Sequence, residues 1–167
     1  MVKDMKQNIF KTNVMRILDQ HKINYKTYCY ADSDAINGME VASTLGLNPN
    51  QTFKTLVTVS NSKTYYVFMI SVNHELDLKK CASAVNEKSI EMIKSSELLN
   101  LTGYIHGGCS PIGMKKQFKT VIDIDASNFD TIIFSAGKIG YQVELSLSDL
   151  SKIIKFDLKD IKKIESV

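Results

Sequence analysis

The sequence has no apolar run long enough to cross a bilayer, and its N-terminus (MVKDMKQNIF) carries charges where a signal peptide needs an apolar segment. Its three cysteines, Cys29, Cys81 and Cys109, cannot all pair and do not have the spacing of metal ligands. The three histidines are equally scattered, so the pattern gives no support for a zinc or iron site. We therefore expect a cytoplasmic protein without a membrane segment, in a reducing environment.

The chain also lacks internal repeats, low-complexity segments and a linker rich in proline or glycine. Its 167 residues are enough for one full hydrophobic core and rather few for two. With 44% apolar and 23% charged residues, the composition is that of an ordinary globular protein. We predict a single domain that spans residues 1–167.

Positive charge is limited and unevenly placed. The formal net charge of +3 resides in the segment 151–163, where five lysines stand against two aspartates. A second cluster consists of Lys115, Lys116 and Lys119. Such clusters are most often solvated surface. The alternative is a modest phosphate-binding surface, too weak for a protein that coats DNA but adequate for one acidic ligand such as tRNA.

Hydrophobic periodicity predicts an α+β fold. Asn37 and Glu40 have the spacing of a capping box, and Gly46 stands where a left-handed residue ends a helix. Ser148 is expected to cap a closing helix. Strands outnumber helices and follow one another through short turns, which favours a curled, mixed, mostly antiparallel sheet with helices packed outside it. The predicted helices are 10–22, 37–47, 75–86, 95–101 and 148–154, and the predicted strands are 23–31, 53–60, 64–72, 90–93, 119–124, 131–136 and 141–147.

One lysine stands at the mouth of an apolar strand. In the segment NQTFKTLVTVS, residues 50–60, a period of two places Lys54 on the same face as Leu56. Lys54 could be an edge lysine whose methylene groups lie along the sheet while its ammonium group reaches water. It could also be a pocket lysine that meets a negative charge, and the segment alone leaves both interpretations open.

Two glycine-containing segments do not fit a packed core. The segment GYIHGGCSPIGMKK, residues 103–116, allows a ligand to approach main-chain N–H groups closely. Its Cys109 has only His106 nearby as a partner, which is thin support for a nucleophilic thiolate. In FSAGKIGYQVEL, residues 134–145, Ser135 ends a strand where its hydroxyl can point into a cleft. Neither segment has the spacing of a nucleotide triphosphate site.

Taken together, these segments resemble a known family. The order of TNVMRILDQHKI, FKTLV, GGCSPIGMKK and SAGKIGYQVEL is similar to that of the YbaK/EbsC family of trans-editing aminoacyl-tRNA deacylases, closest to its Cys-tRNA(Pro) and Cys-tRNA(Cys) deacylases. The resemblance is strongest over residues 12–154. It implies a mixed sheet that closes on itself with surrounding helices, a fold shared with the editing insertion of bacterial prolyl-tRNA synthetases.

The resemblance also implies roles for individual residues. The catalytic positions fall on Lys54, Gly107 and Ser135, and the pocket tyrosine falls on Tyr30, with Tyr28 as the alternative. Further contacts with the substrate are expected from Gly108, Ser110 and Gly137. Contacts with tRNA are expected from Lys115, Lys116 and Lys119. No metal and no cofactor is implied. The segment 31–37 departs from the relatives, which leaves the amino-acid preference open.

The implied activity is removal of cysteine from mischarged tRNA(Pro), with prolyl-tRNA synthetase as a partner and no role for DNA. In the implied reaction, the thiol of the mischarged cysteine attacks its own ester carbonyl, so that the protein needs no nucleophile. Three other interpretations remain. They are hydrolytic removal of alanine or serine from tRNA, a non-catalytic module that binds tRNA or a synthetase, and a protein that binds a small metabolite.

Overall fold

Two β-sheets make up the framework of the computed structural model, which describes residues 10–164. The α+β prediction is confirmed. The three-stranded sheet is antiparallel and has the order β1 (Lys26–Cys29), β7 (Tyr141–Leu145), β6 (Ile132–Ser135). The five-stranded sheet has the order β4 (Ile90–Met92), β2 (Phe53–Ser60), β3 (Tyr65–Ser71), β5 (Lys119–Asp123), β8 (Asp157–Lys159). It is mixed, because β3 and β8 both run parallel to β5.

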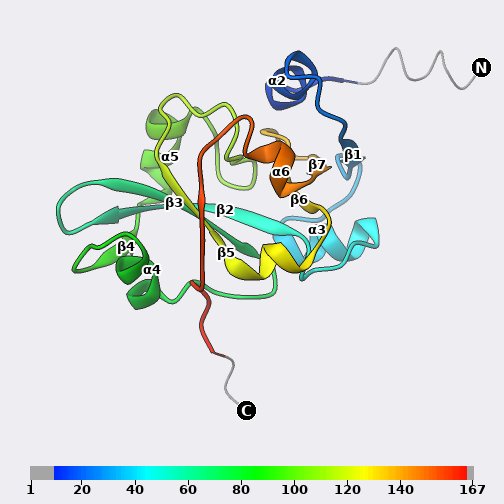
Figure 1. The fold of residues 1–167 in the computed structure, drawn as a ribbon. Coiled ribbons are helices and arrows are strands. Elements are labelled where there is room, and N and C mark those ends of the chain that lie inside the picture. The colour runs from blue at the N-terminus through cyan, green and yellow to red at the C-terminus, as the bar shows by residue number, and fades with distance from the viewer. Residues whose placement is uncertain (1–9, 165–167) are drawn as a thin grey trace, which may run out of the picture.

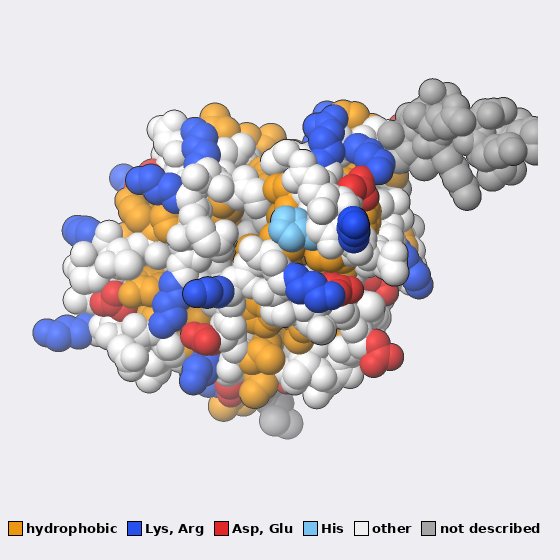
Figure 2. Space-filling model, turned by 45° about the horizontal axis from the view of Figure 1, so that its top comes forward, with side chains coloured by type: hydrophobic (Ala, Val, Ile, Leu, Met, Phe, Trp, Pro, Cys, Tyr) orange, Lys and Arg blue, Asp and Glu red, His pale blue; other side chains and the backbone are white. Residues whose placement is uncertain are grey.

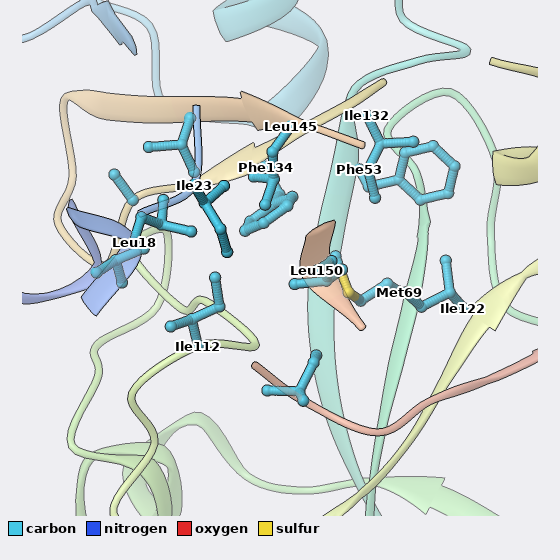
Figure 3. Packing of buried hydrophobic residues seen from close by; sticks show 14 of the residues in the cluster. Leu18, Ile23, Phe53, Met69, Ile112, Ile122, Ile132, Phe134, Leu145 and Leu150 are labelled. Carbon is cyan, nitrogen blue, oxygen red and sulfur yellow. The ribbon is translucent and has the colours of Figure 1, made fainter. Parts of the chain in front are cut away.

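A single parallel bridge between Thr52 and Ile133 joins the two sheets. It brings the start of β2 beside β6, although the two strands are far apart in the sequence. Behind this junction, Phe53 and Met69 of the larger sheet pack with Phe134 and Leu145 of the smaller one (Figure 3). The main core therefore holds the two sheets in a fixed relation, and the cavity described below depends on that relation.

Helices lie around the sheets (Figure 1). In Figure 1, α2 lies at one end of the molecule near β1, and α4 lies at the opposite end beside β4. No helix within residues 10–164 combines the length and the apolar character that a membrane span needs. The helices are α2 (Asn13–Gln20), α3 (Gly38–Leu45), α4 (Leu78–Ala84), α5 (Ser95–Thr102), α6 (Leu147–Leu150) and the 3-10 helix η1 (Ile124–Asn128).

Local capping signals were reliable guides to the helix ends. The capping box of Asn37 and Glu40 begins α3, and Gly46 ends it with a φ of 67°. Thr12 caps α2 through its side chain, and the Asp77 carboxylate accepts from two main-chain N–H groups at the start of α4. The predicted bounds of α3 are confirmed because its caps depend only on residues within one turn of the helix.

The end of the chain differs from the prediction. Ser146, not Ser148, caps the closing helix, and its hydroxyl accepts from the N–H of Asp149 at 3.0 Å. The strand β8 was not predicted, because its three residues show no apolar alternation. It is held by long-range contacts instead: the Asp123 carboxylate accepts from the N–H of Ile161 at 3.0 Å, and Lys162 forms an ion pair with Asp125 at 3.1 Å.

Candidate active site

A cavity of about 620 Å³ opens beside the first half of β2. Four predicted site residues from four separate segments line it: Lys54, Gly107, Ser135 and Tyr30. The start of α3 and the start of α5 also contribute to its walls. The volume lies within the range of small-molecule sites in proteins. The fold therefore brings together the positions that the sequence placed in separate motifs.

The cavity exists because β2 lacks a neighbour along half of its length. β4 pairs with β2 only from Thr58 to Ser60. One further hydrogen bond runs from the N–H of Ile93 to the carbonyl oxygen of Val57 at 3.4 Å. No strand in the described part of the chain pairs with Thr55 on that side. The open edge of β2 thus borders the cavity.

Lys54 is a cavity lysine and not a solvated edge lysine. It lines the cavity and is half-buried, on the face of β2 that also carries Leu56, while the intervening Thr55 is buried. Burial lowers the pKa of Lys54, and the negative charge of Glu75 opposes this shift. Glu75 is itself paired with Lys163 at 3.2 Å. Among residues 10–164, no side chain forms an ion pair or hydrogen bond with the ammonium group of Lys54, which is therefore available to an anionic ligand.

Ser135 lies level with Lys54 on the adjacent strand. The parallel bridge pairs Thr52 with Ile133, so two residues further along each strand Lys54 and Ser135 face the same side. The Ser135 hydroxyl oxygen accepts a hydrogen bond from the N–H of Gly137 at 3.1 Å. Its proton is thereby left free to donate, and Ser135 can offer a hydrogen bond to a group in the cavity.

In the loop 103–116, the N–H groups of the adjacent glycines Gly107 and Gly108 have different surroundings. Gly107 lines the cavity and has a φ of +89°, which favours glycine. The N–H of Gly108, however, donates to the carbonyl oxygen of Ile105 at 3.0 Å and closes a turn. A Cβ atom on Gly108 would lie 3.1 Å from the backbone nitrogen of Ile139, so Gly108 packs against the 137–140 turn. The N–H of Gly108 is therefore not free to polarise a ligand, and contact of Gly108 with substrate stays a prediction.

Two other residues predicted to contact the substrate, Ser110 and Gly137, are packed against the protein itself. Ser110 is completely buried, and its hydroxyl oxygen accepts from the N–H of Ile112 at 3.4 Å. Gly137 has a φ of +88° and packs so closely against α2 that a Cβ atom would lie 2.9 Å from Val14. Neither residue is among those that line the cavity. Their contact with substrate stays a prediction.

Tyr30, and not Tyr28, reaches the cavity. Tyr30 is buried directly after β1, where its N–H donates to the carbonyl oxygen of Gly140 at 2.7 Å. The hydroxyl of Tyr28 instead donates to Glu144 at 2.5 Å, and this hydrogen bond, with burial, raises the pKa of Tyr28 to about 12. Of the two tyrosines, only Tyr30 lines the cavity, and its contact with substrate stays a prediction.

Cys109 lines the cavity without the properties of a nucleophile. Its side chain is buried and packs with Val57, Val67 and Leu98. Burial raises the pKa of the Cys109 thiol to about 12, so the thiol is protonated at neutral pH. The described residues also contain no group of three or more His, Cys, Asp or Glu side chains that could hold a metal ion.

Two further cavity residues were not predicted as site residues. His106 lines the cavity and is exposed. Gln142 lines it from β7, directly opposite Ser135 in the register of β6 and β7. In YQVEL, Gln142 alternates with apolar residues, a pattern that indicates only the polar face of a strand. Its position in the cavity depends on strand pairing, for which the local sequence carries no signal.

Comparisons with known proteins identify the family of this chain. A model of the family described as "Aminoacyl-tRNA editing domain" matches residues 35–153. The chain belongs to this family.

This editing-domain protein matches nearly the whole length of one relative and a small part of a larger enzyme. A protein of Enterococcus faecalis named "Putative Cys-tRNA(Pro)/Cys-tRNA(Cys) deacylase EbsC" is 50% identical over 137 residues, which are 81% of this chain and 84% of that one. A proline–tRNA ligase of Trichlorobacter lovleyi is 27% identical over 99 residues, 59% of this chain and only 17% of the ligase.

Solved structures share the fold. The chain in "Crystal structure of a putative trans-editing enzyme for prolyl tRNA synthetase" has a TM-score of 0.78 at 20% identity, and the match covers 93% of this chain and 100% of that one. A second structure, of the hypothetical protein APE2540, gives a TM-score of 0.82 at 18% identity, with 91% of this chain and 100% of that one covered. At these identities the likeness concerns the fold alone.

Basic side chains of this editing-domain protein form no continuous block on the face shown in Figure 2, where lysines and arginines are spread among uncharged groups and several acidic ones. In the C-terminal segment, Lys152 and Lys163 are held in ion pairs with Asp149 and Glu75, at 2.8 and 3.2 Å. The predicted tRNA-binding lysines are exposed and lie outside the cavity, and their role stays a prediction. They are Lys115, Lys116 and Lys119.

Proposed function

We propose that this protein is an aminoacyl-tRNA deacylase that removes cysteine from mischarged tRNA(Pro). The observation that carries the proposal is the ammonium group of Lys54. It is half-buried and lines a cavity with Gly107 and Ser135, and no described side chain pairs with it. A cation in such a place is suited to an anionic ligand, and the 3′ end of tRNA brings a phosphate next to the ester. The name of the 50% identical relative supports cysteine as the amino acid.

In the proposed reaction, the substrate supplies its own nucleophile. The sulfur of the esterified cysteine forms a bond to its carbonyl carbon, and the bond from that carbon to the ribose oxygen breaks. The thiol proton passes to the departing ribose oxygen, so that the products are a cyclic thiolactone and tRNA. The protonated state of Cys109 supports this route, since the cavity's only cysteine among the described residues is a poor nucleophile at neutral pH.

Under this proposal, the protein contributes placement and electrostatics. The N–H of Gly107 polarises the ester carbonyl and stabilises the oxyanion, an interaction whose loss typically slows a reaction by about 10²- to 10³-fold. Lys54 holds the terminal phosphate and ribose. The hydroxyl groups of Ser135 and Tyr30 orient the ester in the cavity. Each of these four residues lines the same cavity, which supports a joint role.

Deacylation assays with purified protein test the proposal. Wild-type protein should deacylate Cys-tRNA(Pro), and Lys54→Met should lose at least about 100-fold in kcat/KM. Lys88→Met, which changes an exposed lysine outside the cavity, should retain activity. Saturable tRNA binding without turnover by the wild-type protein would instead identify a non-catalytic module.

The choice of amino acid and nucleophile needs a second comparison. Ala-tRNA(Pro) and Ser-tRNA(Pro) lack a thiol, and S-methylated Cys-tRNA(Pro) has a blocked one. All three should be stable in the presence of the protein if the substrate thiol attacks. Equal cleavage of the blocked and free cysteine esters would show that water is the nucleophile.

Prolyl-tRNA synthetase is the proposed partner. The match to part of a proline–tRNA ligase supports a relation between the two activities. Without a continuous basic face on the side shown in Figure 2, the protein gains from a partner that selects the tRNA. Addition of the synthetase should lower the KM for Cys-tRNA(Pro) and leave the KM for a cysteinyl-adenosine fragment unchanged.

A further inference from the structure

Two residues that line the cavity carry a polar side-chain atom without a partner in the described part of the chain, Thr55 and Gln142. The side-chain oxygen Oε1 of Gln142 is buried and accepts no hydrogen bond from any residue that the structure describes, and Gln142 as a whole is only 7% exposed. Burial of an unsatisfied amide oxygen is unfavourable, and native structures contain few such atoms. Gln142 lines the cavity, so rotation of its terminal amide, a soft torsion, would bring this oxygen to a hydrogen-bond donor on a ligand.

Gln142 ends a row of three functional side chains that crosses three adjacent strands. Lys54 on β2 lies level with Ser135 on β6, and Ser135 is paired with Gln142 on β7. Paired residues point to the same side of a sheet, so all three belong to one face.

The two ends of this row differ in charge. Lys54 provides a cation at one end, and Gln142 provides a neutral acceptor at the other. Asp and Glu are missing among the described residues that line the cavity. A ligand that carries its own cation would be repelled near Lys54 and accommodated near Gln142. Thr55, the other lining residue with an unsatisfied atom, lies on the opposite face of β2 from Lys54, with Phe53 and Val57, and is therefore not part of the row.

An aminoacyl ester at the end of tRNA has this distribution of charge. Its phosphate lies on one side of the ester carbonyl, and its α-ammonium group lies on the other. We propose that Gln142 binds the α-ammonium group of the aminoacyl substrate through Oε1, opposite the phosphate at Lys54, with the ester beside Ser135. This inference rests on the proposed function, because it takes an aminoacyl-tRNA as the ligand.

The test compares ligands with and without the amino group. The probes are 3′-amino-3′-deoxyadenosine 5′-phosphate carrying either a cysteinyl or a 3-mercaptopropionyl group in amide linkage, which prevents turnover. Wild-type protein should bind the cysteinyl probe more tightly. Gln142→Leu should weaken its binding about 10- to 100-fold, the usual range for a lost hydrogen bond to a charged group, and leave binding of the 3-mercaptopropionyl probe unchanged. Gln142→Glu, which keeps the acceptor, should retain the preference for the amino group.

A structural role for Gln142 predicts different results. Because Gln142 Oε1 has no described partner, Gln142→Leu should not lower the Tm. Gln51→Leu is the matched control: the Gln51 amide donates to the carbonyl oxygen of Thr131 at 2.9 Å and lies outside the cavity. This control should lower the Tm and keep the preference for the cysteinyl probe.

Three results would overturn the inference. In the first, Gln142→Leu weakens the binding of both probes equally. In the second, Gln142→Glu loses the preference for the probe with an amino group. In the third, Gln142→Leu binds an alanyl probe as tightly as wild type does, which would assign Gln142 to the thiol. Because binding is measured on amides, the outcome is separate from the proposed reaction. A wild-type protein that binds both probes but cleaves no ester would contradict the deacylase and leave the comparison at Gln142 decisive.

Discussion

The main-chain N–H of Gly108 donates to the carbonyl oxygen of Ile105 at 3.0 Å, and in this turn the N–H of the preceding Gly107 has no acceptor among residues 10–164. Of the two glycines, only Gly107 lines the cavity. Of the two glycine N–H groups, only that of Gly107 is therefore left to meet an ester carbonyl placed there. Activity should consequently be sensitive to the conformation of this single residue.

Gly107→Ala should therefore reduce kcat for Cys-tRNA(Pro) by about 100-fold or more. A Cβ atom would lie 3.6 Å from Ile139, so the methyl group has space. The φ of +89° is nevertheless unfavourable for alanine by about 1–2 kcal/mol, and relaxation of the backbone would turn the N–H away from the substrate. Single-turnover deacylation measures the effect on the chemical step.

Gly46→Ala provides the matched control. Gly46 also has a positive φ, of 67°, and a Cβ atom there would meet nothing within 4 Å. It ends α3 and does not line the cavity. Both variants should lose similar stability, but Gly46→Ala should keep kcat within about threefold of wild type. If the two variants lose kcat equally, Gly107 is not the carbonyl donor.

Lys54→Met should make the folded protein more stable at pH 7 while it removes activity. Burial lowers the pKa of Lys54 below its ordinary value of 10.5. Between the lowered and the ordinary pKa, the unfolded chain binds more protons than the folded one, so wild-type stability rises with pH in that window. The gain from Lys54→Met should thus be largest at neutral pH and shrink as the pH approaches 10.5. Urea unfolding at pH 7 and pH 10 measures it.

Lys162→Met should have the opposite effect. Burial acts to lower the pKa of Lys162, but its hydrogen bond to Asp125 and the charges of Asp123, Asp125 and Asp160 outweigh burial and raise it. Its contribution to stability is complete below the unfolded pKa and is lost as the pH rises through the folded one. Lys162→Met should therefore destabilise the protein at pH 7. Equal signs for the two lysines would contradict the description of Lys54 as an unpaired, partly desolvated cation.

The sequence predicted those features that depend on near neighbours. The capping box of α3 requires only Asn37 and Glu40, and the shared face of Lys54 and Leu56 requires only the period of a strand. Gln142 shows the limit of this reasoning. Its alternation placed it on a polar face, but its location in the cavity depends on pairing with Ser135 and on the bridge from Ile133 to Thr52. Such long-range pairings leave no local pattern.

The glycine loop shows a second limit. The residues HGGCSP indicated a loop in which main-chain N–H groups are accessible, and Gly107 meets that expectation. Which N–H remains accessible depends on the turn from Ile105 to Gly108 and on contact with Ile139. Adjacent glycines permit several turns of equal local cost, so the packing partner, and not the motif, decides between them.

Cys109→Ala should leave deacylation nearly unchanged. The thiol is buried, and its pKa of about 12 keeps it protonated at neutral pH. We expect kcat/KM within about threefold of wild type, with a loss of about 1 kcal/mol of stability from the smaller side chain beside Val57 and Leu98. Cys109→Ser should be equally active. A thousandfold loss in both variants would instead assign the attacking thiol to the enzyme.

Alkylation gives an independent measurement of the same property. Cys29 is exposed, whereas burial raises the pKa of both Cys81 and Cys109 to about 12. Iodoacetamide at pH 8 should therefore modify Cys29 first, and deacylation should persist after one equivalent has reacted. Rapid modification of Cys109, detected by peptide mass spectrometry, would contradict a buried thiol.

Neutral substitution of the exposed lysine cluster should flatten the salt dependence of tRNA binding. These lysines follow the loop that brings Gly107 to the cavity, and we propose that they contact the acceptor stem. Each phosphate contact contributes about 0.7–0.9 to the slope of log K against log salt concentration. The triple Lys→Gln variant should lower this slope by about 2 to 3. The substituted residues are Lys115, Lys116 and Lys119.

The control must change the net charge equally at another place. The control is a triple Lys→Gln variant in which three other exposed lysines outside the cavity are replaced, Lys88, Lys155 and Lys159. If long-range attraction alone governs binding, both triple variants will weaken it equally, and both effects will fade above about 0.15 M salt, where the screening length is about 8 Å. Direct phosphate contacts predict a smaller slope only for the 115–119 variant. An unchanged slope there would exclude these lysines from the tRNA interface.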